Sequence, residues 1–383
     1  MIRKITAIIL TAAVSLCTVL TAHAAGYSQI NNKAESTADY LLTCPVPGVA
    51  SIGGEWMVIG LARGGKISKE FTDGYYNNAL SYVKSAGSAR LHRSKSTENS
   101  RMIIALTAIG KNPQNVSGYN LLAPLADFNF VKKQGINGPV WALIAFDTMQ
   151  YEIPVDTSVS VQTTREKLID YILSKQCADG GWDLEGEHPD PDITGMTLQA
   201  LAPYVNKNIA VKTAVDKALE VMSNNQNADG SFSTGGENTP ESCAQMITAL
   251  SALNIDCLSD NRFIKSNQSV ADSLLGFSVE NGFEHTKGMG YNQMSTEQSY
   301  YSLVSYQRFT CGQNTLYDMT DLIAHGDINQ SGTATITDAT LIQKYIAQST
   351  NFTLLQQKVA DIDKNGRVDI NDVTSLQKYL AAK

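Results

Sequence analysis

Two twelve-residue segments near the C-terminus carry oxygen-bearing side chains at the spacing that a calcium ion requires. They begin at Asp327 and Asp361, and each has such side chains at positions 1, 3, 5, 9 and 12. Position 6, where the chain must turn sharply, is Gly332 in the first segment and Gly366 in the second. Because Ca²⁺ prefers a cage of oxygen ligands, the sequence predicts two Ca²⁺ sites. The predicted ligands are Asp327, Asn329, Ser331, Thr333, Asp338, Asp361, Asp363, Asn365, Arg367, Asp369 and Asp372.

The two segments differ in the charge of their ligands. Thr333 and Arg367 stand at position 7 and would contribute main-chain carbonyl oxygens. Ser331 and Thr335 are weak, neutral ligands in the first segment, whereas the second segment keeps more carboxylates. The first site is therefore predicted to be the weaker one.

A second set of chemically capable side chains lies near the starts of predicted helices in the middle of the chain. If the starts of these helices lie at the same end of the fold, the side chains form a rim there. A pair of carboxyl groups on this rim could act as general acid and base in glycoside cleavage. Acidic residues also favour helix N-termini electrostatically, so a solvated rim of capping residues is the alternative. The set comprises Glu55, Glu98, His188, Asp190, Asp192, Glu241, Glu284, His285 and Glu297.

The motif Glu241-Ser242-Cys243 places a carboxylate and a thiol two residues apart, and His285 follows in a later loop. Carboxylate, thiolate and imidazole are all zinc ligands. However, Thr239-Pro240-Glu241 is typical of a helix start, with a cap, a first-turn proline and an acid matched to the helix dipole. On that interpretation Cys243 is a small buried residue, and no zinc is expected.

These side chains stand between helices that repeat along the chain. Residues 176–182, QCADGGW, recur 50 residues later as residues 226–232, QNADGSF. Gly282-Phe283 belongs to a third, degenerate copy. Amphipathic helices are predicted before the first two copies, over 165–175 and 211–223. Each copy precedes a helix that is apolar or small on nearly all sides, which is typical of a buried helix. The repeating unit is thus an outer helix, a Gly-aromatic turn and an inner helix.

Six inner helices are predicted, centred near residues 56, 102, 141, 196, 246 and 300. Six helical hairpins with hidden inner helices close most readily into a ring, since a ring leaves no unpaired end repeat. The sequence therefore predicts an all-α protein. Its parts would be an (α/α)6 toroid over 25–312, a linker over 313–325 and a small Ca²⁺-binding domain over 326–383.

The turn pattern Gln-x-x-Asp-Gly-x-Trp/Phe resembles the Gln-Trp repeat of squalene cyclases, which are terpene cyclases, and the related repeat of protein prenyltransferase β subunits. The resemblance covers roughly residues 40–310 and implies the α/α toroid. The cyclase acid, Asp-x-Asp-Asp, would fall near Asp190-Pro191-Asp192, which lacks the Asp pair. The prenyltransferase zinc histidine would fall near Ser295-Thr296-Glu297, which has none. Neither activity is therefore expected.

The C-terminal duplication extends into the helices that follow the two loops. Gln343-Lys344-Tyr345-Ile346 matches Gln377-Lys378-Tyr379-Leu380 at an offset of 34. Residues 326–383 resemble a type I dockerin, which implies Ca²⁺-dependent folding and binding to a cohesin domain of a scaffolding protein, as in cellulosomes. By this resemblance the cohesin-binding residues are Ile336, Thr337, Lys344, Tyr345, Ile370, Asn371, Lys378 and Tyr379.

The N-terminus has the pattern of a cleaved secretory signal. Arg3 and Lys4 precede a mostly apolar run over 5–20, and Ala22-His23-Ala24 is a small-x-small cleavage site. This predicts a signal peptide over 1–24 and a secreted, extracellular protein. No later stretch approaches the length of apolar sequence that a bilayer span needs, so no membrane association is expected.

Composition narrows the partners further. The net charge is −7, which provides no electrostatic footprint for nucleic acid, so nucleic-acid partners are not expected. The five cysteines outside the signal are too few, and odd in number, for a disulfide framework, and the sequence does not determine their pairing.

The function predicted from the sequence is that of a secreted, cellulosome-type component. Its dockerin would bind Ca²⁺ and a scaffoldin cohesin. Its toroid would act as a binding module in plant polysaccharide degradation, with a polysaccharide or a small molecule as ligand. Two alternatives stay open: a carbohydrate-active enzyme of the glycoside hydrolase or lyase type that uses rim carboxylates, and a degenerate relative of the prenyltransferases or terpene cyclases.

Overall fold

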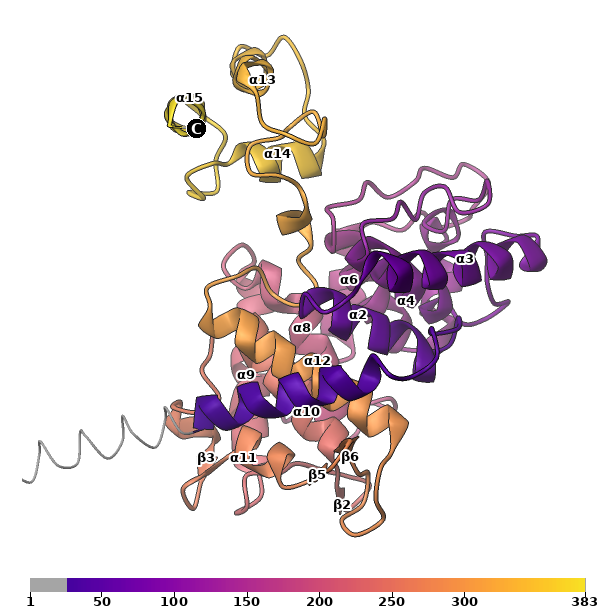
Figure 1. Cartoon of the computed structure of the whole chain (residues 1–383), viewed down its shortest axis with the longest axis vertical. Helices are drawn as coiled ribbons and strands as arrows, with labels where there is room; N and C mark the ends of the chain where they lie inside the picture. Colours follow the sequence, from indigo (N-terminus) through magenta and orange to yellow (C-terminus); the bar gives the residue numbers. More distant parts are fainter. Residues whose placement is uncertain (1–25, 383) are drawn as a thin grey trace, which may run out of the picture. The chain divides into compact units, whose positions relative to one another are not determined.

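Helices dominate the computed structural model, which describes residues 26–382 (Figure 1). The predicted signal peptide lies outside the described residues. All six predicted inner helices form, and the all-α class is confirmed. They are α2 (Trp56–Arg63), α4 (Thr97–Ala108), α6 (Asn137–Asp147), α8 (Pro191–Leu201), α10 (Pro240–Ala252) and α12 (Gln293–Thr310). None of the helices within 26–382 is long and apolar enough to cross a membrane.

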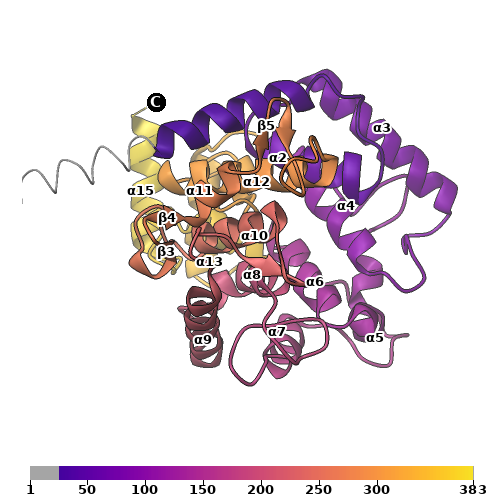
Figure 2. The same cartoon turned by 90° about the horizontal axis from the view of Figure 1, so that it is seen from below.

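The chain folds into two compact units, and the first contains residues up to Thr72 together with Leu173–Cys311. Its inner helices pack in the order α8, α10, α12, α2, so the last inner helix of the chain packs against the first (Figure 2). This contact between the first and last repeats is the one that the predicted ring requires. Each of these helices buries apolar side chains: Leu198, Ile247 and Leu303, for example, are fully buried.

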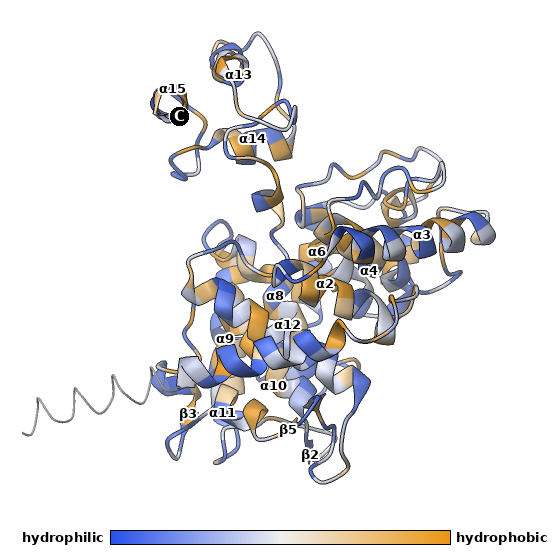
Figure 3. Ribbon diagram, in the orientation of Figure 1, coloured by the Kyte–Doolittle hydropathy of each residue, from blue (hydrophilic) through white to orange (hydrophobic). Residues whose placement is uncertain are grey.

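Outer helices cover this row of inner helices. They include a helix over residues 26–41, which shows the two-faced colouring of an amphipathic helix (Figure 3), and α9 (Ile209–Asn225). On α9 the buried stripe includes Val215, Leu219 and Met222. The outer helix before α12 is only the six-residue α11 (Val270–Leu275), which packs against α10. Two further helices, α3 (Lys69–Ala86) and α7 (Arg165–Ser174), cross the division between the units.

The Gly-aromatic turns are anchored by their aromatic side chains. Trp182, Phe232 and Phe283 are buried. The side-chain amide of Gln176 donates to the carbonyl oxygen of Ala214 at 2.8 Å, which joins the turn to α9. These three turns thus fix where α8, α10 and α12 begin.

Three short antiparallel hairpins lie between helices of the first unit. Ser233–Thr234 (β1) pairs with Glu237–Asn238 (β2), with Ser233 opposite Asn238. The intervening Gly235 and Gly236 have φ of 60° and 87°, which suits the two-residue hairpin turn that needs left-handed backbone at both positions. The other pairs are Ile264–Lys265 (β3) with Gln268–Ser269 (β4), and Ser278–Val279 (β5) with Gly282–Phe283 (β6).

The second unit contains Asp73–Ile172 and Gly312–Lys383. Its inner helices α4 and α6 pack against each other. Three short helical segments lie between them in the chain: η2 (Ala123–Ala126), α5 (Phe128–Val131) and η3 (Lys132–Gln134). Within the predicted linker, Leu316 and Met319 are buried, and the Met319 N–H donates to the carbonyl oxygen of Thr148 at 2.8 Å.

The C-terminal part of this unit has three helices, α13 (Ile336–Ile346), α14 (Leu354–Ala360) and α15 (Ile370–Ala381), after a short turn, η6 (Thr320–Leu322). Helices α13 and α15 pack against each other. Their core pairs equivalent residues of the two halves: Ile342 of α13 matches Leu376 of α15, and both are fully buried. The core is thus built from the duplicated sequence.

Candidate functional sites

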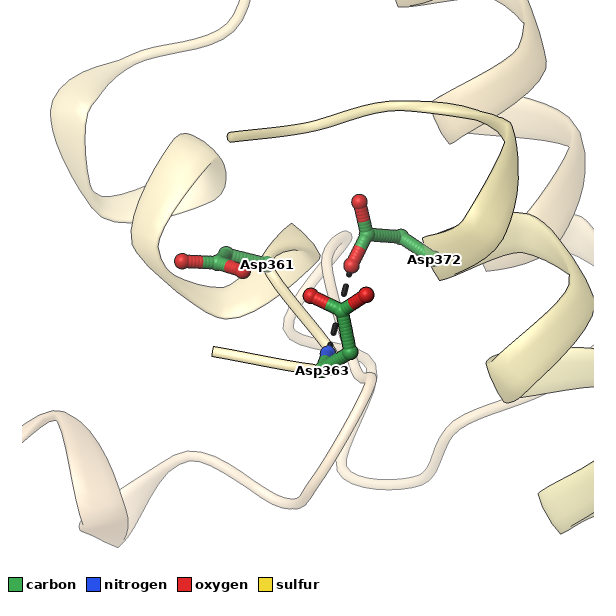
Figure 4. Close-up of side chains that lie close together, drawn as sticks. All are labelled: Asp361, Asp363 and Asp372. Atoms are coloured by element: carbon green, nitrogen blue, oxygen red, sulfur yellow. Dashed lines mark hydrogen bonds between the residues drawn. The ribbon is translucent and has the colours of Figure 1, made fainter. Parts of the chain in front are cut away.

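Three carboxylates of the second calcium loop converge. Asp361, Asp363 and Asp372 offer oxygen atoms within 4.8 Å of one another (Figure 4). Asp372 is buried, and its Oδ1 accepts hydrogen bonds from the N–H groups of Ile362 and Asp363 at 2.7 and 3.3 Å. One Asp361 oxygen, Oδ1, is buried without a hydrogen-bond partner. Like charges this close repel one another, so the arrangement suits a bound cation.

The other predicted ligands of the second loop order its backbone. Asn365 donates from its amide to Asp363 Oδ2 at 3.0 Å, and its own oxygen accepts from the Arg367 N–H at 2.9 Å. Asp369 caps α15 by accepting from the Asn371 N–H at 2.7 Å. The loop residues thus hold one another in place at the start of the helix.

The first loop has the same construction. Asp327 is buried and accepts from the N–H groups of Ser331 and Gly332 at 2.9 and 2.7 Å. Asp338 is also buried and accepts from the Asn329 N–H at 3.0 Å. The Ser331 hydroxyl donates to the carbonyl oxygen of Thr333 at 3.1 Å, so the predicted first-loop ligands lie together.

Backbone conformation matches between the loops as well. Gly332 and Gly366, at position 6, have φ of 100° and 85°. Gln330 and Lys364, at position 4, have φ of 55° and 59°. Left-handed backbone is uncommon for residues other than glycine, so its recurrence at equivalent positions indicates one loop geometry used twice.

The predicted cohesin-binding residues fall into two groups by exposure. Ile336 and Ile370 begin α13 and α15 and are 63% and 60% exposed, which is unusual for large aliphatic side chains. Thr337, Asn371, Lys344 and Lys378 are also exposed. Tyr345 and Tyr379 are half-buried against the core of this region. Tyr345 stacks on Phe352 at 4.4 Å between ring centroids, whereas Tyr379 meets His325 edge-on at 5.1 Å.

A pocket of about 400 Å³ opens at the N-terminal ends of three inner helices of the first unit. Helix α8 contributes Asp192, α10 contributes Glu241, and α12 contributes Met294 and Gln298. The β1–β2 hairpin and the loop after β6 complete it. Its lining is Asp192, Thr234, Gly235, Glu237, Thr239, Glu241, His285, Met294 and Gln298.

Glu241 and His285, two residues of the predicted rim, form an ion-pair contact in this pocket. His285 Nδ1 lies 3.0 Å from Glu241 Oε2. Glu241 is 5% exposed, and its other oxygen accepts a short hydrogen bond from the Ser295 hydroxyl. The carboxylate is therefore held on both sides, and it orients the imidazole toward the pocket.

Asp192 is the most perturbed acid of the pocket. Its pKa is raised to about 6, mainly by burial and in smaller part by the nearby Asp190 and Glu241 charges, against the opposing effect of a hydrogen bond with Ser242. Its Oδ1 is buried and has no hydrogen-bond partner. Such a group is a candidate for contact with a ligand.

Two other rim residues form a separate buried group. Glu55 and Glu297 are both fully buried. Burial raises the pKa of Glu297 to about 7, and the Glu55 charge adds to the shift. Glu297 Oε1 accepts from the Gly53 N–H at 2.9 Å and from the Gln293 amide at 2.5 Å. This pair does not line the pocket.

The remaining rim residues have local structural roles. Asp190 caps α8 by accepting from the N–H groups of Asp192 and Ile193. Glu284 accepts from the N–H groups of Gly288 and Gly290 and so closes the loop after β6. In the second unit, Glu98 pairs with Arg101 at 2.6 Å. The His188 N–H donates to Asp183, in the loop before α8. The predicted solvated, capping role therefore describes part of the rim.

Cys243 occupies a structural position. It is fully buried, burial raises its pKa to about 12, and its Sγ contacts the Ser273 hydroxyl at 3.9 Å. Within 26–382, the sole group of three acidic, His or Cys side chains close enough to share a metal ion is that of the second calcium loop. The described Cys44, Cys177, Cys243, Cys257 and Cys311 are all free thiols.

Sequence reasoning missed an amide network beneath the pocket. Gln199 donates to Gln245 Oε1 at 2.9 Å, and Gln245 donates to Gln298 Oε1 at 3.2 Å and to the Tyr301 hydroxyl at 2.8 Å. A signal was present, since Gln245 and Gln298 each stand four residues after a pocket residue, on the same helix face.

The comparisons with known proteins agree with the C-terminal geometry. The family model of the dockerin type I domain matches residues 325–381, so the chain carries a type I dockerin. No curated protein matches the chain. Among solved structures, an apo type II terpene cyclase from Scytonema is similar at 12% identity with a TM-score of 0.48, and the match covers 74% of this chain and 98% of that one. A likeness of that size assigns no activity.

Proposed function

We propose that this protein is an extracellular, cellulosome-type component that docks through its two calcium loops and the helices after them. The observation that carries the proposal is the duplicated loop–helix unit, in which each helix begins with an exposed isoleucine directly after a cage of oxygen ligands. A dockerin supports Ca²⁺ binding and attachment to a cohesin. We further propose that both loops bind Ca²⁺, one ion each, through the residues predicted from the sequence.

Calcium would connect the loops to the docking surface. Asp338 and Asp372 are loop residues, yet each also caps its helix, because Thr335 and Asp369 form capping boxes with them. An ion bound in the loop therefore fixes the first turn of the helix, which carries Ile336 or Ile370. Tyr345 and Tyr379 would support the helices from the core side. Cohesin would contact the exposed residues Ile336, Thr337, Lys344, Ile370, Asn371 and Lys378.

The test is binding of the full chain to immobilised cohesins of several types, in excess Ca²⁺ and in chelator. We expect affinity for at least one cohesin in Ca²⁺ and a loss of about a hundredfold or more in chelator, equivalent to about 3 kcal/mol. Asp361→Ala together with Asp327→Ala should reproduce the chelator result in Ca²⁺. Asp216→Ala, which removes an exposed carboxylate of α9, is the matched control. Binding that survives in chelator would contradict the proposal.

For the helical region before the dockerin we propose a role as a ligand-binding module carried into a polysaccharide-degrading assembly. The pocket at the starts of α8, α10 and α12 supports this role, because it gathers polar groups from three helices and a hairpin. None of the described lining residues is Phe, Tyr or Trp, which argues against a platform for sugar rings or an apolar wall for a prenyl chain. The enzymatic alternatives therefore have less support than binding.

A further inference from the structure

The lining of the pocket described above has a strong charge imbalance. Three carboxylate side chains face it, those of Asp192, Glu237 and Glu241, and the described lining contains neither lysine nor arginine. His285 is the single basic side chain, and Glu241 already holds its Nδ1. Carboxylates gathered in a partly enclosed space are stabilised by a positive partner. The lining of the pocket therefore favours a positively charged ligand.

We propose that this pocket binds a small organic cation, an alkylammonium or guanidinium compound. The proposal rests on the binding role proposed for the helical region and is independent of cohesin docking. A nitrogen cation with several N–H donors can contact carboxylates that stand apart, because its donors point in different directions. The unpartnered Oδ1 of Asp192 is the acceptor that such a donor would satisfy.

A bound metal ion fits these residues less well. The ligand atoms of Asp192, Glu241 and His285 do not form one of the close groups that a metal needs, whereas those of the second calcium loop do. Metal–oxygen and metal–nitrogen bonds are shorter than about 2.6 Å, so the ligand atoms around an ion must crowd together. The wider spacing of these three residues suits a hydrogen-bonding ligand between the groups better than an ion.

The rest of the lining suits the carbon chain of such a ligand. Met294 contributes a thioether, which packs adaptably against alkyl groups. Gln298 is held from below, since its Oε1 accepts from Gln245 and from the Tyr301 hydroxyl at 3.2 Å each. Thr239 is buried beside Glu241 and is bonded to the Ser242 hydroxyl at 2.9 Å. The charged groups therefore stand on a largely pre-formed floor, which lowers the cost of binding.

The test is calorimetric titration of the full chain with cadaverine at pH 8, in excess Ca²⁺ so that the dockerin carboxylates are occupied. Its neutral isostere 1,5-pentanediol, cellobiose, Zn²⁺ and an acetylated lysine amide are titrated in parallel. We expect cadaverine to bind and the diol and cellobiose not to bind. Acetylated lysine amide distinguishes a free diamine from the side chain of a peptide as the source of the cation. Affinity for cadaverine should fall as the pH is lowered through about 6, because Asp192 then becomes neutral.

Variants locate the site. Asp192→Asn and Glu237→Gln should each weaken cadaverine about tenfold or more, the loss typical of a charged hydrogen bond. Glu237 is exposed on β2, so its variant stays informative where the Asp192 variant fails to fold. Glu220→Gln, on the exposed face of α9, removes the same charge elsewhere and should leave affinity unchanged. Equal binding of the diol, preference for cellobiose, stoichiometric Zn²⁺ lost with Asp192, or no cadaverine binding would each overturn the proposal. Cohesin binding in the same samples is read separately.

Discussion

The carboxyl groups at the starts of the inner helices lie in two different environments. Asp192 and Glu241 open onto the pocket, whereas Glu297 is closed off. Glu297 is fully buried, and its Oε2 has no hydrogen-bond partner although Oε1 has two. An ionised carboxylate in such a place is unfavourable, which is why burial raises the pKa of Glu297 to about 7. The folded protein therefore binds a proton there that the unfolded chain releases.

This raised pKa predicts how stability depends on pH. Between the ordinary glutamate pKa of 4.5 and about 7, the folded state holds more protons than the unfolded state. The free energy of unfolding should therefore fall as the pH rises through that window. Glu297→Gln keeps an acceptor for Gly53 and removes the titration, so it should stabilise the protein by about 2 kcal/mol at pH 8 and have little effect at pH 5.

Urea unfolding in excess Ca²⁺ at the two pH values measures the difference. The exposed Glu220→Gln serves as the control for net charge, and it should shift stability by less than about 0.5 kcal/mol at either pH. The same stabilisation by Glu297→Gln at pH 5 and pH 8 would show that the carboxyl is not the titrating group.

At the scale of elements, one side chain ties each Gly-aromatic turn to the inner helix that follows it. The Thr194 hydroxyl bonds both the N–H and the carbonyl oxygen of Trp182 at 2.9 Å. Thr296 makes the equivalent pair of bonds to Phe283, at 3.0 and 3.2 Å. In the middle repeat this position is Cys243, whose sulfur interacts with the backbone at Phe232. The cysteine is therefore a substitute for threonine in a repeated structural tie.

This equivalence gives a prediction about the turn. Thr194→Val keeps the shape of the side chain but removes both bonds, and should lower the free energy of unfolding by about 1 to 3 kcal/mol. Cys243→Thr should be more stable than Cys243→Val by about 1 kcal/mol, because only threonine restores the tie. The two Cys243 variants have nearly the same volume, so each is the packing control for the other in chemical unfolding. If Cys243→Val is as stable as Cys243→Thr, the tie has no energetic role.

Helices and loops could be predicted from the sequence where a residue pattern recurs, whereas the contacts between side chains could not. All six inner helices are visible as runs of apolar and small residues, and the calcium loops as oxygen side chains at fixed spacing. The short hairpins are too brief to show a period-two pattern. The sequence predicted that the rim residues share one face of the fold. It could not predict their hydrogen-bond partners, because these depend on the path of each loop. Glu241 meets His285 across 44 residues, whereas Glu297 turns to Gly53. The role of Cys243 could have been found by aligning it with Thr194 and Thr296.

At the scale of the whole molecule, the dockerin presents two nearly equivalent surfaces. Ile336 and Ile370 have almost the same exposure, and Lys344 and Lys378 follow each isoleucine at the same distance along the helix. The two cores are less alike, since Tyr345 stacks on Phe352 and Tyr379 contacts His325. These differences lie on the core side of the helices. Among the predicted cohesin-binding residues of the loops, only one position differs, Thr337 against Asn371.

A half-turn of the dockerin would therefore present nearly the same surface to one cohesin, and we expect either half to dock. Ile336→Asp with Lys344→Glu should disable one orientation and cost only a factor of about two in affinity, or about 0.4 kcal/mol. Adding Ile370→Asp and Lys378→Glu should cost several kcal/mol, because both orientations then bury unpaired charge. Titration of one cohesin with the wild type, each single-half variant and the double variant separates the cases. If one single-half variant already abolishes binding and the other does not, the duplication is a relic and one half alone is functional. An intermediate preference would indicate that Thr337 and Asn371 bias the choice, and exchanging these two residues should then reverse it.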